Sequence, residues 1–450
     1  MVRRVESRAQ RALHSVLGHG AQHQRRRQIS PHAADYNLGI DMTVWRTVAR
    51  VAWLLTACAA GSQSAAGAQT LPSEPIALAD GRVTVGGDVS ATFGSTDPGF
   101  FNYTDYEHSA LRMLRLDVSA AAKAGPHFTL LGEVRTENLN SVRPYALYLR
   151  IRPWTARDFD IQVGRVPPTF GAFARRTYAS DNPLIGYPLA YQYLTTLRPD
   201  SIPATADELL QRRGLGWRTK YTVGNTVSEI GVPLVSAFRW DTGVQVHGTA
   251  GIVTATAAVT AGTVSNPLFT DDNSGRQVAG RVELRPVTGL IVATSLARGP
   301  FVSDSAARSA VGDGHDAAFT QTAWGGDVEY SRGYYLIRFE TIISDWRLPV
   351  VRRPAIDMPL RASSTSVEGR YKIMTGLYVA ARVDHLGFSD LAGSLVTEPW
   401  DVPVTRIEIG GGFSIQRNLL LKLSYQHDNR DGGPLQRVGK FVAGQLVFWF

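Results

Sequence analysis

Charged side chains recur at every second position in several segments of about ten residues. Arg115 and Asp117 are separated by Leu116, and Arg382 and Asp384 are separated by Val383. Residues two apart lie on the same face of a β-strand, so each segment carries charge on one face and apolar side chains on the other. A face with charges of both signs can hold water and ions, whereas the opposite face requires apolar surroundings.

The alternation predicts which charged side chains share the water-facing side. Most of them are expected to form ion pairs across strands, and their balance is slightly basic. Anion selection would need a local excess of basic residues at the narrowest point of a pore. The predicted water-facing residues are Arg115, Asp117, Glu133, Arg135, Arg150, Arg281, Glu283, Arg338, Glu340, Arg370, Lys372, Arg382, Asp384, Arg406 and Glu408.

The sequence lacks the motifs that mark common catalytic and metal sites. It contains no HExxH, GxSxG or phosphate-binding loop, and the glycine run Gly410, Gly411 and Gly412 is not followed by lysine and serine or threonine. Histidines are scattered over different segments: His108, His127, His247, His315, His385 and His427. We therefore expect no enzymatic activity, no cofactor and no metal site.

The expected fold follows from these segments, each of which has one charged face and one apolar face. From residue 82 onward they follow one another, joined by short turns with glycine or proline and by longer polar loops in alternation. This pattern predicts an all-β, transmembrane, antiparallel β-barrel over residues 82–450, with its apolar face toward lipid. The segments number roughly 18, and 16 is the alternative. The larger count requires a turn at Gly224 and Asn225 and a strand at 229–235, which contains Pro233.

Aromatic residues cluster near the predicted strand ends. Amphipathic rings favour the headgroup level of a membrane, so two girdles are expected. The residues assigned to them are Tyr221, Tyr330, Tyr334, Tyr335, Tyr371 and Trp449 on the periplasmic side, and Trp346 and Phe388 on the outer side.

The last strand resembles a known assembly signal. Residues 438–450 alternate, are rich in aromatic residues and stop on Phe450. They are similar to the closing strand of bacterial outer-membrane β-barrels, in which a C-terminal aromatic residue is the usual assembly signal. The resemblance implies that Phe450 has this role, that the barrel-assembly machinery and outer-membrane lipid are partners, and that the protein lies in the outer membrane of a Gram-negative cell.

The start of the chain agrees with export. Arg46 and Arg50 precede a short apolar stretch and then small residues that end at Ala68. This order predicts a signal peptide at 42–68 with cleavage near Ala68, followed by a periplasmic lead-in at 69–81. Residues 1–41 are interpreted as a mis-assigned translation start or a disordered basic extension. The residues before and including Cys58 resemble a lipobox, so a lipid anchor is an alternative.

The leader accounts for most of the positive charge. The whole chain has a net charge of +8. Residues 1–41 contribute +4, and Arg46 and Arg50 contribute +2, which leaves about +2 for the mature chain. This small excess gives no reason to expect nucleic acid as a partner. The single cysteine, Cys58, also lies in the leader, so the mature chain has no disulfide.

One long loop is the candidate site. The residues Gly164-Arg165-Val166-Pro167-Pro168 and then Phe170-Gly171 resemble the segment before the inward-folding loop of porins, including phosphate-selective porins. The resemblance implies that loop 166–212 folds into the barrel and forms a constriction, in which charges filter solutes by size and sign. An external lid is the alternative. The candidate constriction residues are Arg175, Arg176, Asp181, Arg198, Asp200, Asp207 and Glu208.

The porin resemblance sets the expected function. It implies passive diffusion of small hydrophilic solutes, and the slightly basic balance of the water-facing residues adds a weak preference for anions. It also implies a homotrimer. Two other classes remain open, namely a non-conducting structural or adhesive barrel and an outer-membrane lipid hydrolase. Ion conductance separates the first from a porin, and a serine–histidine pair on the lipid face would mark the second.

Overall fold

The computed structural model describes most of the chain after the predicted leader. The described residues are 72, 74–94, 114–139, 142–237, 240–313, 319–430 and 439–450, without the side chain of Arg175. The upstream extension 1–41 and the signal peptide 42–68 with Cys58 lie outside this part. No helix within the described residues combines the length and the apolar character needed to cross a membrane.

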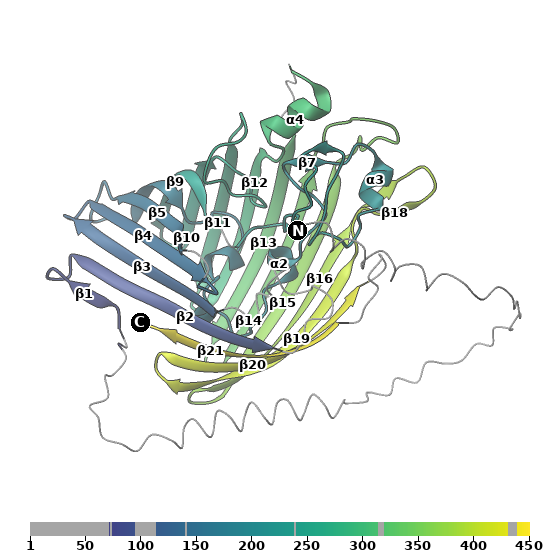
Figure 1. The fold of residues 1–450 in the computed structure, drawn as a ribbon. Helices are drawn as coiled ribbons and strands as arrows, with labels where there is room; N and C mark the ends of the chain where they lie inside the picture. The colour runs from purple at the N-terminus through teal and green to yellow at the C-terminus, as the bar shows by residue number, and fades with distance from the viewer. Residues whose placement is uncertain are drawn as a thin grey trace, which may run out of the picture. The chain divides into compact units, whose positions relative to one another are not determined.

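The main element is a closed antiparallel sheet (Figure 1). Sixteen strands each pair with the next, and β21 returns to pair with β2, which closes the barrel. The strands are β2 (Val83–Gly94), β3 (Leu114–Ala124), β4 (Phe128–Glu137), β5 (Val142–Ile151), β6 (Phe159–Val166), β9 (Asp241–Ala250), β10 (Val253–Thr260), β11 (Gln277–Val287), β12 (Leu290–Pro300), β13 (Thr320–Arg332), β14 (Tyr335–Trp346), β15 (Leu360–Met374), β16 (Leu377–Phe388), β19 (Val404–Gln416), β20 (Leu419–Arg430) and β21 (Gly439–Trp449).

The strand count is the alternative value of 16. The 18-strand count needed a turn at Gly224 and Asn225 and a strand at 229–235. The structure places both in the segment between β6 and β9, outside the barrel wall. Pro233 lacks an N–H group for a ladder, and the short stretch before it has little of the alternation seen in the true strands.

The two faces of the wall differ as the alternation predicts. On β15, Ser366 and Glu368 are buried inside the barrel, while Val367 between them is 46% exposed on the outside. A slip of one residue would move every inward charge of a strand into lipid, so the charged positions fix the register. Loop length fixes the orientation, because short turns lie at the periplasmic end of such barrels and long loops at the extracellular end.

The short turns at the periplasmic end need little chain. The turn between β11 and β12 contains Gly289, which has a φ of +86°. A Cβ atom at this position would lie 2.0 Å from the carbonyl oxygen of Ser331. Both observations make glycine the residue that this turn requires.

The longest connection lies between β6 and β9 and covers residues 167–240. It extends beyond the predicted loop 166–212, because the region assigned to two further strands belongs to it. Figure 1 shows α2 in the interior of the barrel, with β7 and α3 at the extracellular end. The elements of this segment are η2 (Phe173–Arg175), η3 (Ala179–Asp181), α2 (Leu189–Gln192), β7 (Ser201–Ile202), α3 (Ala206–Leu210) and β8 (Val223–Gly224).

Other extracellular loops contain short elements of their own. These are α4 (Asp304–Val311), β17 (Asp390–Ala392) and β18 (Thr397–Pro399). Helix α4 contacts β7 and β8, and α3 contacts β17. The extracellular loops and the second half of segment 167–240 therefore pack together at this end of the barrel.

The aromatic assignments are correct only in part. Tyr334, Tyr335 and Tyr371 are exposed beside one periplasmic turn, and the rings of Tyr335 and Tyr371 lie 5.0 Å apart. The assignments of Tyr221 and Trp346 to the membrane surface are wrong, because both side chains are buried. Trp346 ends β14 on the inward side of the strand, where its ring packs against loop residues instead of lipid.

The barrel closes around the C-terminal residue. Phe450 exchanges two backbone hydrogen bonds with Gly87 of β2, both 3.0 Å long. A Cβ atom on Gly87 would lie 2.6 Å from the Phe450 ring, so the ring occupies the space that a side chain would need. Strand β1 (Ile76–Leu78), within the expected lead-in 69–81, pairs with β2 next to this site. The two ends of the chain thus meet on one strand.

We predict that Gly87→Val weakens closure of the barrel. The new side chain would displace the Phe450 ring, and such overpacking costs about 1–3 kcal/mol. The free energy of unfolding, measured by urea titration of the refolded barrel in lipid vesicles, should fall by that amount. Gly369→Val is the matched control, because Gly369 also lies in a strand and a Cβ atom there meets no atom within 4 Å. Equal losses in both variants would contradict the role assigned to Phe450.

Candidate functional site

A ladder of alternating charges crosses the inner wall. Glu329, Arg338, Glu368, Arg382 and Glu408 lie directly opposite one another on β13, β14, β15, β16 and β19. Arg338 bonds Glu329 at 2.8 Å and Glu368 at 3.0 Å, and Arg382 bonds Glu368 at 3.3 Å and Glu408 at 2.7 Å. Each arginine therefore joins two neighbouring strands, and the signs alternate along the row.

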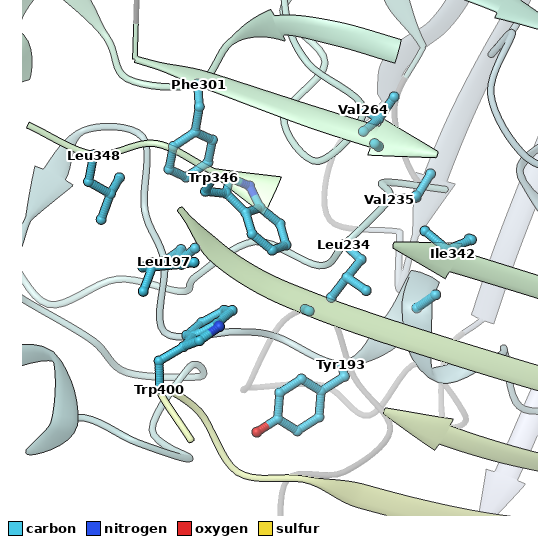
Figure 2. Packing of buried hydrophobic residues seen from close by; sticks show 14 of the residues in the cluster. Tyr193, Leu197, Leu234, Val235, Val264, Phe301, Ile342, Trp346, Leu348 and Trp400 are labelled. Atoms are coloured by element: carbon cyan, nitrogen blue, oxygen red, sulfur yellow. The ribbon is translucent and has the colours of Figure 1, made fainter. Parts of the chain in front are cut away.

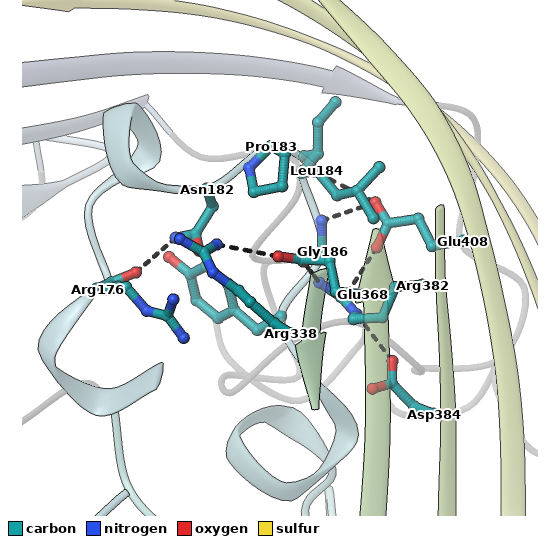
Figure 3. A network of polar contacts seen from close by, with 12 residues as sticks. Arg176, Asn182, Pro183, Leu184, Gly186, Arg338, Glu368, Arg382, Asp384 and Glu408 are labelled. Carbon is teal, nitrogen blue, oxygen red and sulfur yellow. Dashed lines mark hydrogen bonds and ion pairs between the residues drawn. The ribbon is translucent and has the colours of Figure 1, made fainter. Parts of the chain in front are cut away.

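Further ion pairs lie beside this ladder. Arg382 also bonds Asp384 at 2.9 Å, as Figure 3 shows. Arg281 bonds Asp327 at 2.6 Å, and Arg406 bonds Asp428 at 2.7 Å. Because these groups are buried and each has a charged partner, they form a fixed pattern of charge on the wall.

The opposite wall carries a smaller cluster. Asp117 on β3 accepts hydrogen bonds from Arg115, at 2.8 Å, and from Arg135 on β4. The Arg135 guanidinium lies 3.4 Å from the ring centre of Tyr145, and Glu133 is 3.6 Å from Arg135. Both walls are therefore polar and ion-paired where they face the lumen.

The first part of the long segment, residues 167–192, lies between these walls, and we call it the inner limb. On the side of β2 to β4, Tyr178 donates a 2.5 Å hydrogen bond to Glu133, and Ser180 donates one of 2.5 Å to Asp88. Arg115 donates a 2.8 Å hydrogen bond to the hydroxyl of Tyr187. Side chains of the limb thus bind charged groups of the wall directly.

The inner limb also contacts the far wall. Arg176 bonds Glu329 at 2.7 Å, at the same carboxylate oxygen that Arg338 contacts. Glu340 on β14 accepts hydrogen bonds from the Tyr191 hydroxyl at 2.6 Å and from the Ala172 N–H at 2.7 Å. The limb therefore spans the lumen and is held on both sides.

Two wall residues hold the backbone of the inner limb. Glu408 accepts hydrogen bonds from the N–H groups of Ile185, at 3.2 Å, and Gly186, at 2.9 Å, while it also binds Arg382 (Figure 3). A Cβ atom on Gly186 would lie 2.2 Å from the side-chain amide nitrogen of Gln426 and 2.6 Å from a carboxylate oxygen of Glu408, so a larger residue would displace these two side chains. Lys422 on β20 donates hydrogen bonds to the carbonyl oxygens of Ala179 and Leu184 and is fully buried.

A cavity of about 300 Å³ lies between the inner limb and the wall formed by β11 to β16. Gly171, Ala172, Phe173 and Pro188 of the limb line one side. Its charged lining comprises five arginines and five acidic residues, namely Arg176, Arg281, Arg285, Arg338, Arg382, Glu283, Asp327, Glu329, Glu340 and Glu368. With these charged groups in its lining, the space can admit water and small polar solutes.

The predicted constriction residues separate into two groups. Arg176 lines the cavity, and Asp181 is exposed in η3 of the inner limb. The side chain of Arg175 lies outside the described part. Four others lie beyond the inner limb, nearer the extracellular end, where they hold loop segments together: Arg198, Asp200, Asp207 and Glu208.

Contacts within the loops explain these four positions. Arg198 is buried, bonds Asp200 at 2.8 Å, and donates to the carbonyl oxygen of Val227 at 2.6 Å. Asp207 accepts a 2.6 Å hydrogen bond from Ser394, and Glu208 accepts one of 3.0 Å from Thr222. The sequence shows that these four residues are charged, but it does not show which loop groups they bind.

The predicted water-facing residues lie on the inner side of their strands. On each strand they alternate with the apolar side chains of the outer face, as the burial patterns of β3, β14 and β16 illustrate. Lys372 differs in being exposed at the periplasmic end of β15. Apart from Arg150 and Arg370, the other charged residues of the list form the ion pairs and hydrogen bonds given above, and Glu283 bonds Arg285 at 2.7 Å.

Several site residues were missed in the sequence. Asp327 and Glu329 flank Val328 on β13, and Lys422 stands between Leu421 and Leu423 on β20. The alternation that revealed other inward charges would have revealed these as well. The tyrosines of the inner limb could not be found in this way, because a loop has no regular alternation of inward and outward residues.

The second part of the long segment, residues 193–237, packs with three extracellular loops. We call this assembly the outer cap, and the three loops are residues 301–313, 346–359 and 389–403. Leu197 and Leu234 are buried beside Trp346 and Trp400, as Figure 2 shows. The two tryptophan rings meet edge-on with centres 5.8 Å apart. The outer cap therefore has an apolar core of its own at the extracellular end.

Asp401 joins the parts of the outer cap. Its carboxylate accepts hydrogen bonds from the N–H groups of Gly214 and Val402, both at 2.8 Å, and of Thr196, at 2.9 Å. Burial raises the pKa of this carboxyl, although the three N–H groups act in the opposite direction. One side chain in an extracellular loop thus holds two distant positions of the long segment.

Comparison with known proteins gives matches in structure alone. No family model and no curated protein matches the chain. OmpF of Salmonella typhi, in complex with daunomycin, aligns with a TM-score of 0.51 at 11% identity, over 82% of this chain and 97% of OmpF. A loop-deletion mutant of OmpT, an outer-membrane protein of Vibrio cholerae, aligns with a TM-score of 0.50 at 11% identity, over 82% and 99%. The chain has a porin-like fold.

The porin-like fold agrees with the barrel closure and with the strand count. At this level of identity the likeness concerns the path of the backbone and not the chemistry of the lumen. The charge ladder and the anchored inner limb are therefore read from this chain's own residues. Within the described residues, no cluster of three or more histidine, cysteine, aspartate or glutamate side chains could hold a metal ion.

We predict that Lys422→Met loosens the inner limb. The carbonyl oxygens of Ala179 and Leu184 would lose a charged donor, which costs about 1–3 kcal/mol in a buried setting. The free energy of unfolding should fall by that amount, and the limb should become a better substrate for proteases. Lys372→Met is the matched control, because Lys372 is exposed on β15. Unchanged protease resistance in Lys422→Met would show that the limb does not depend on this contact.

The pKa of Asp401 gives a prediction for the outer cap. Because this pKa is higher in the folded protein than in an unfolded chain, the folded form binds more protons between the two values. The contribution of Asp401 to stability is therefore largest in acid and falls as the pH rises through the raised pKa. Protease cleavage within 193–237 should accelerate as the pH rises from the ordinary pKa of an aspartate, about 4, through the raised pKa of Asp401.

Substitution isolates this effect. Asp401→Asn removes the titrating group, so the pH dependence of cleavage should become flatter than in the native protein. Asp390→Asn is the control, because Asp390 is exposed in the same extracellular loop. If Asp401→Asn and the native protein have the same slope, another group governs the outer cap.

Proposed function

We propose that the protein is an outer-membrane porin through which small hydrophilic solutes diffuse passively. The observation that carries this proposal is the inner limb, which crosses the lumen and leaves a cavity of about 300 Å³ with charged residues in its lining against the wall. A limb held on both sides restricts the cross-section, and charged walls keep the remaining space wet. Together they support filtering by size.

We propose weak selectivity between ions. The sequence suggested a weak preference for anions, and the cavity lining offers five arginines against five acidic residues. Most of these charges are paired within the wall, so their fields largely cancel at the distance of a passing ion. Any preference would then follow from local asymmetry, and Arg176 is the basic group that the limb adds to the lining.

We further propose the route to the membrane and the assembly that the sequence suggested. The signal peptide 42–68 would be removed near Ala68, and Phe450 would present the last strand to the barrel-assembly machinery. The packing of Phe450 against Gly87 supports a role for this residue in closure. A homotrimer in outer-membrane lipid is the proposed assembly, and no enzymatic role is proposed.

Conductance across a planar bilayer tests the porin proposal. The refolded mature protein should give stable open steps, and a salt gradient should give a reversal potential close to zero. The apolar outer cap makes a non-conducting structural barrel the second candidate, because it packs over part of the extracellular end. A well-folded barrel without conductance would favour that candidate and overturn the pore.

We predict that Arg176→Ala widens the pore and makes it prefer cations. The lining would change from five arginines to four against five acidic residues, and a side chain between limb and wall would be lost. The single-channel conductance should rise, and the reversal potential should move toward that of a cation-preferring pore. Arg308→Ala is the control, because Arg308 lies on the exposed helix α4. Identical currents in both variants would contradict the assignment of Arg176 to the constriction.

A further inference from the structure

The inner wall of β11 to β15 changes character toward its extracellular end. At the level of the cavity its inward residues are charged, among them Arg281, Asp327 and Glu340. Nearer the extracellular end, several inward residues of the same strands are small or apolar, and they are buried. These include Ala279, Ala297, Ala323, Ile342 and Ala362. The wall of a water-filled pore is polar, so these residues need an apolar cover.

The inner limb supplies this cover. Phe170, Phe173 and Tyr191 are buried, and they belong to the same apolar cluster as the small residues of the wall. The rings of Phe173 and Tyr191 lie 5.0 Å apart. A Cβ atom on Gly325 of β13 would lie 3.1 Å from the Phe170 ring, so this ring rests on the strand where the wall has no side chain. We call Phe170, Phe173 and Tyr191 the aromatic roof.

The apolar packing continues from the aromatic roof into the outer cap. The N–H group of Val235 donates a 3.1 Å hydrogen bond to the carbonyl oxygen of Ala190, which joins the cap to the inner limb. Leu234 lies in the same buried cluster as Ile342 and Trp346 of β14, and Figure 2 shows all three. Side chains packed this closely leave no path for water, so the layer on the extracellular side of the cavity is dry.

The cavity is open in the opposite direction. Arg285, beside a periplasmic turn, has a side chain that is 60% exposed, and the side chain of Glu329 is 27% exposed. Farther from that end, the side chains of Arg281 and Asp327 are 6% and 5% exposed. Glu340, which contacts the aromatic roof, is buried. Exposure of the lining thus falls from the periplasmic end to the roof, so the cavity opens toward the periplasm.

One carboxylate holds the aromatic roof against the wall. The same oxygen of Glu340, Oε1, accepts the hydrogen bonds from the Tyr191 hydroxyl and from the N–H group of Ala172. Gly171 has a φ of +79°, and a Cβ atom there would lie 2.4 Å from the Tyr191 hydroxyl. A larger residue would therefore displace this hydroxyl and strain the backbone. Glu340 thus fixes both the Tyr191 ring and the backbone next to Phe173.

The aromatic roof belongs to a segment that is tethered on one side of the barrel. Segment 167–240 leaves the wall at β6 and returns to it at β9, and these two strands pair with each other. Glu340 and Gly325, which contact the roof, lie on β14 and β13 in another part of the wall. The roof can therefore move away from β13 and β14 while the backbone ladder of the barrel stays intact.

We propose that the aromatic roof is a gate, latched by Glu340, and that the cavity is a vestibule open to the periplasm while the gate is closed. Opening would separate Tyr191 and Ala172 from Glu340, and water in the vestibule would then hydrogen-bond the carboxylate. The rings would leave their apolar surroundings, which is unfavourable, so the closed form is the major one. The gate rests on the proposed function, since it would control the diffusion of solutes through the lumen.

Thiol reactivity tests this proposal without a current. In the full chain, Cys58→Ser removes the single native cysteine, so Ser295→Cys then supplies the one thiol. Ser295 is buried and accepts a 3.2 Å hydrogen bond from the N–H group of Gly171 beside the roof. A charged methanethiosulfonate reagent should react with this thiol about tenfold faster when Tyr191→Phe is added, because the latch then loses one buried hydrogen bond to a charged group.

Tyr425→Phe is the matched control. It removes the same hydroxyl group, but Tyr425 is exposed on the outward face of β20. Added to the Ser295→Cys chain, it should leave the rate of labelling unchanged. Equal rates with Tyr191→Phe and Tyr425→Phe would overturn the gate. Heat-modifiable migration in gels establishes that each barrel stays folded during labelling, which excludes general unfolding as the cause of a faster reaction.

Conductance separates the gate from the pore. In a planar bilayer, the open steps of the native protein should alternate with closed intervals, and Tyr191→Phe should raise the ratio of open to closed time about tenfold. Current without closed intervals, unchanged by Tyr191→Phe, would overturn the gate and leave the pore proposal standing. Faster labelling in a barrel that carries no current would support the moving roof and overturn the pore alone.

Discussion

Lipid offers no partner for a backbone N–H or carbonyl group, and this constraint explains the barrel. A sheet in a membrane must close, because an open edge would leave a row of unpaired groups in hydrocarbon. Closure of sixteen strands through the pairing of β2 with β21 creates an interior that side chains of the wall alone do not fill. Charged side chains of the wall are then tolerated only on the side that faces this interior, away from lipid. Their inward placement, the alternation along each strand and the register of the ladder all follow from the need to close.

The inner wall and the inner limb share the same charged groups. Glu329 binds Arg338 of the wall and Arg176 of the limb, and Glu408 binds Arg382 while it accepts two N–H groups of the limb. These carboxylates have several donors, so the loss of one donor leaves others in place. The limb is therefore an extension of the wall network. Its position across the lumen depends on strands that are far apart in the sequence.

The sequence predicted the wall far better than it predicted the loops. Alternation located Arg115, Asp117, Arg382 and Glu408, because a strand face in lipid tolerates little else. The same period would have located Asp327, Glu329 and Lys422. It could not separate a strand from the stretch at 229–235, where a few residues before a proline carry a weak signal. Arg198 and Asp207 were expected at a constriction, yet they bind other loop residues, since contacts between loops leave no periodic trace in a sequence.

The short strand β1 has a consequence for assembly. It pairs with β2 from Val83 to Val85, and the pairing of β2 with the last strand begins three residues later, at Asp88. Both strands therefore use the same edge of β2, one after the other. An unclosed barrel would offer that edge along its whole length, and β1 could slide along it to a different register. Once Phe450 has bound beside Gly87, the last strand covers the rest of this edge of β2. Only the short stretch from Val83 to Val85 is then left for β1. The amide hydrogens of β1 would then be slow to exchange only in barrels that have finished closing, which makes this segment a natural reporter of the final step of folding.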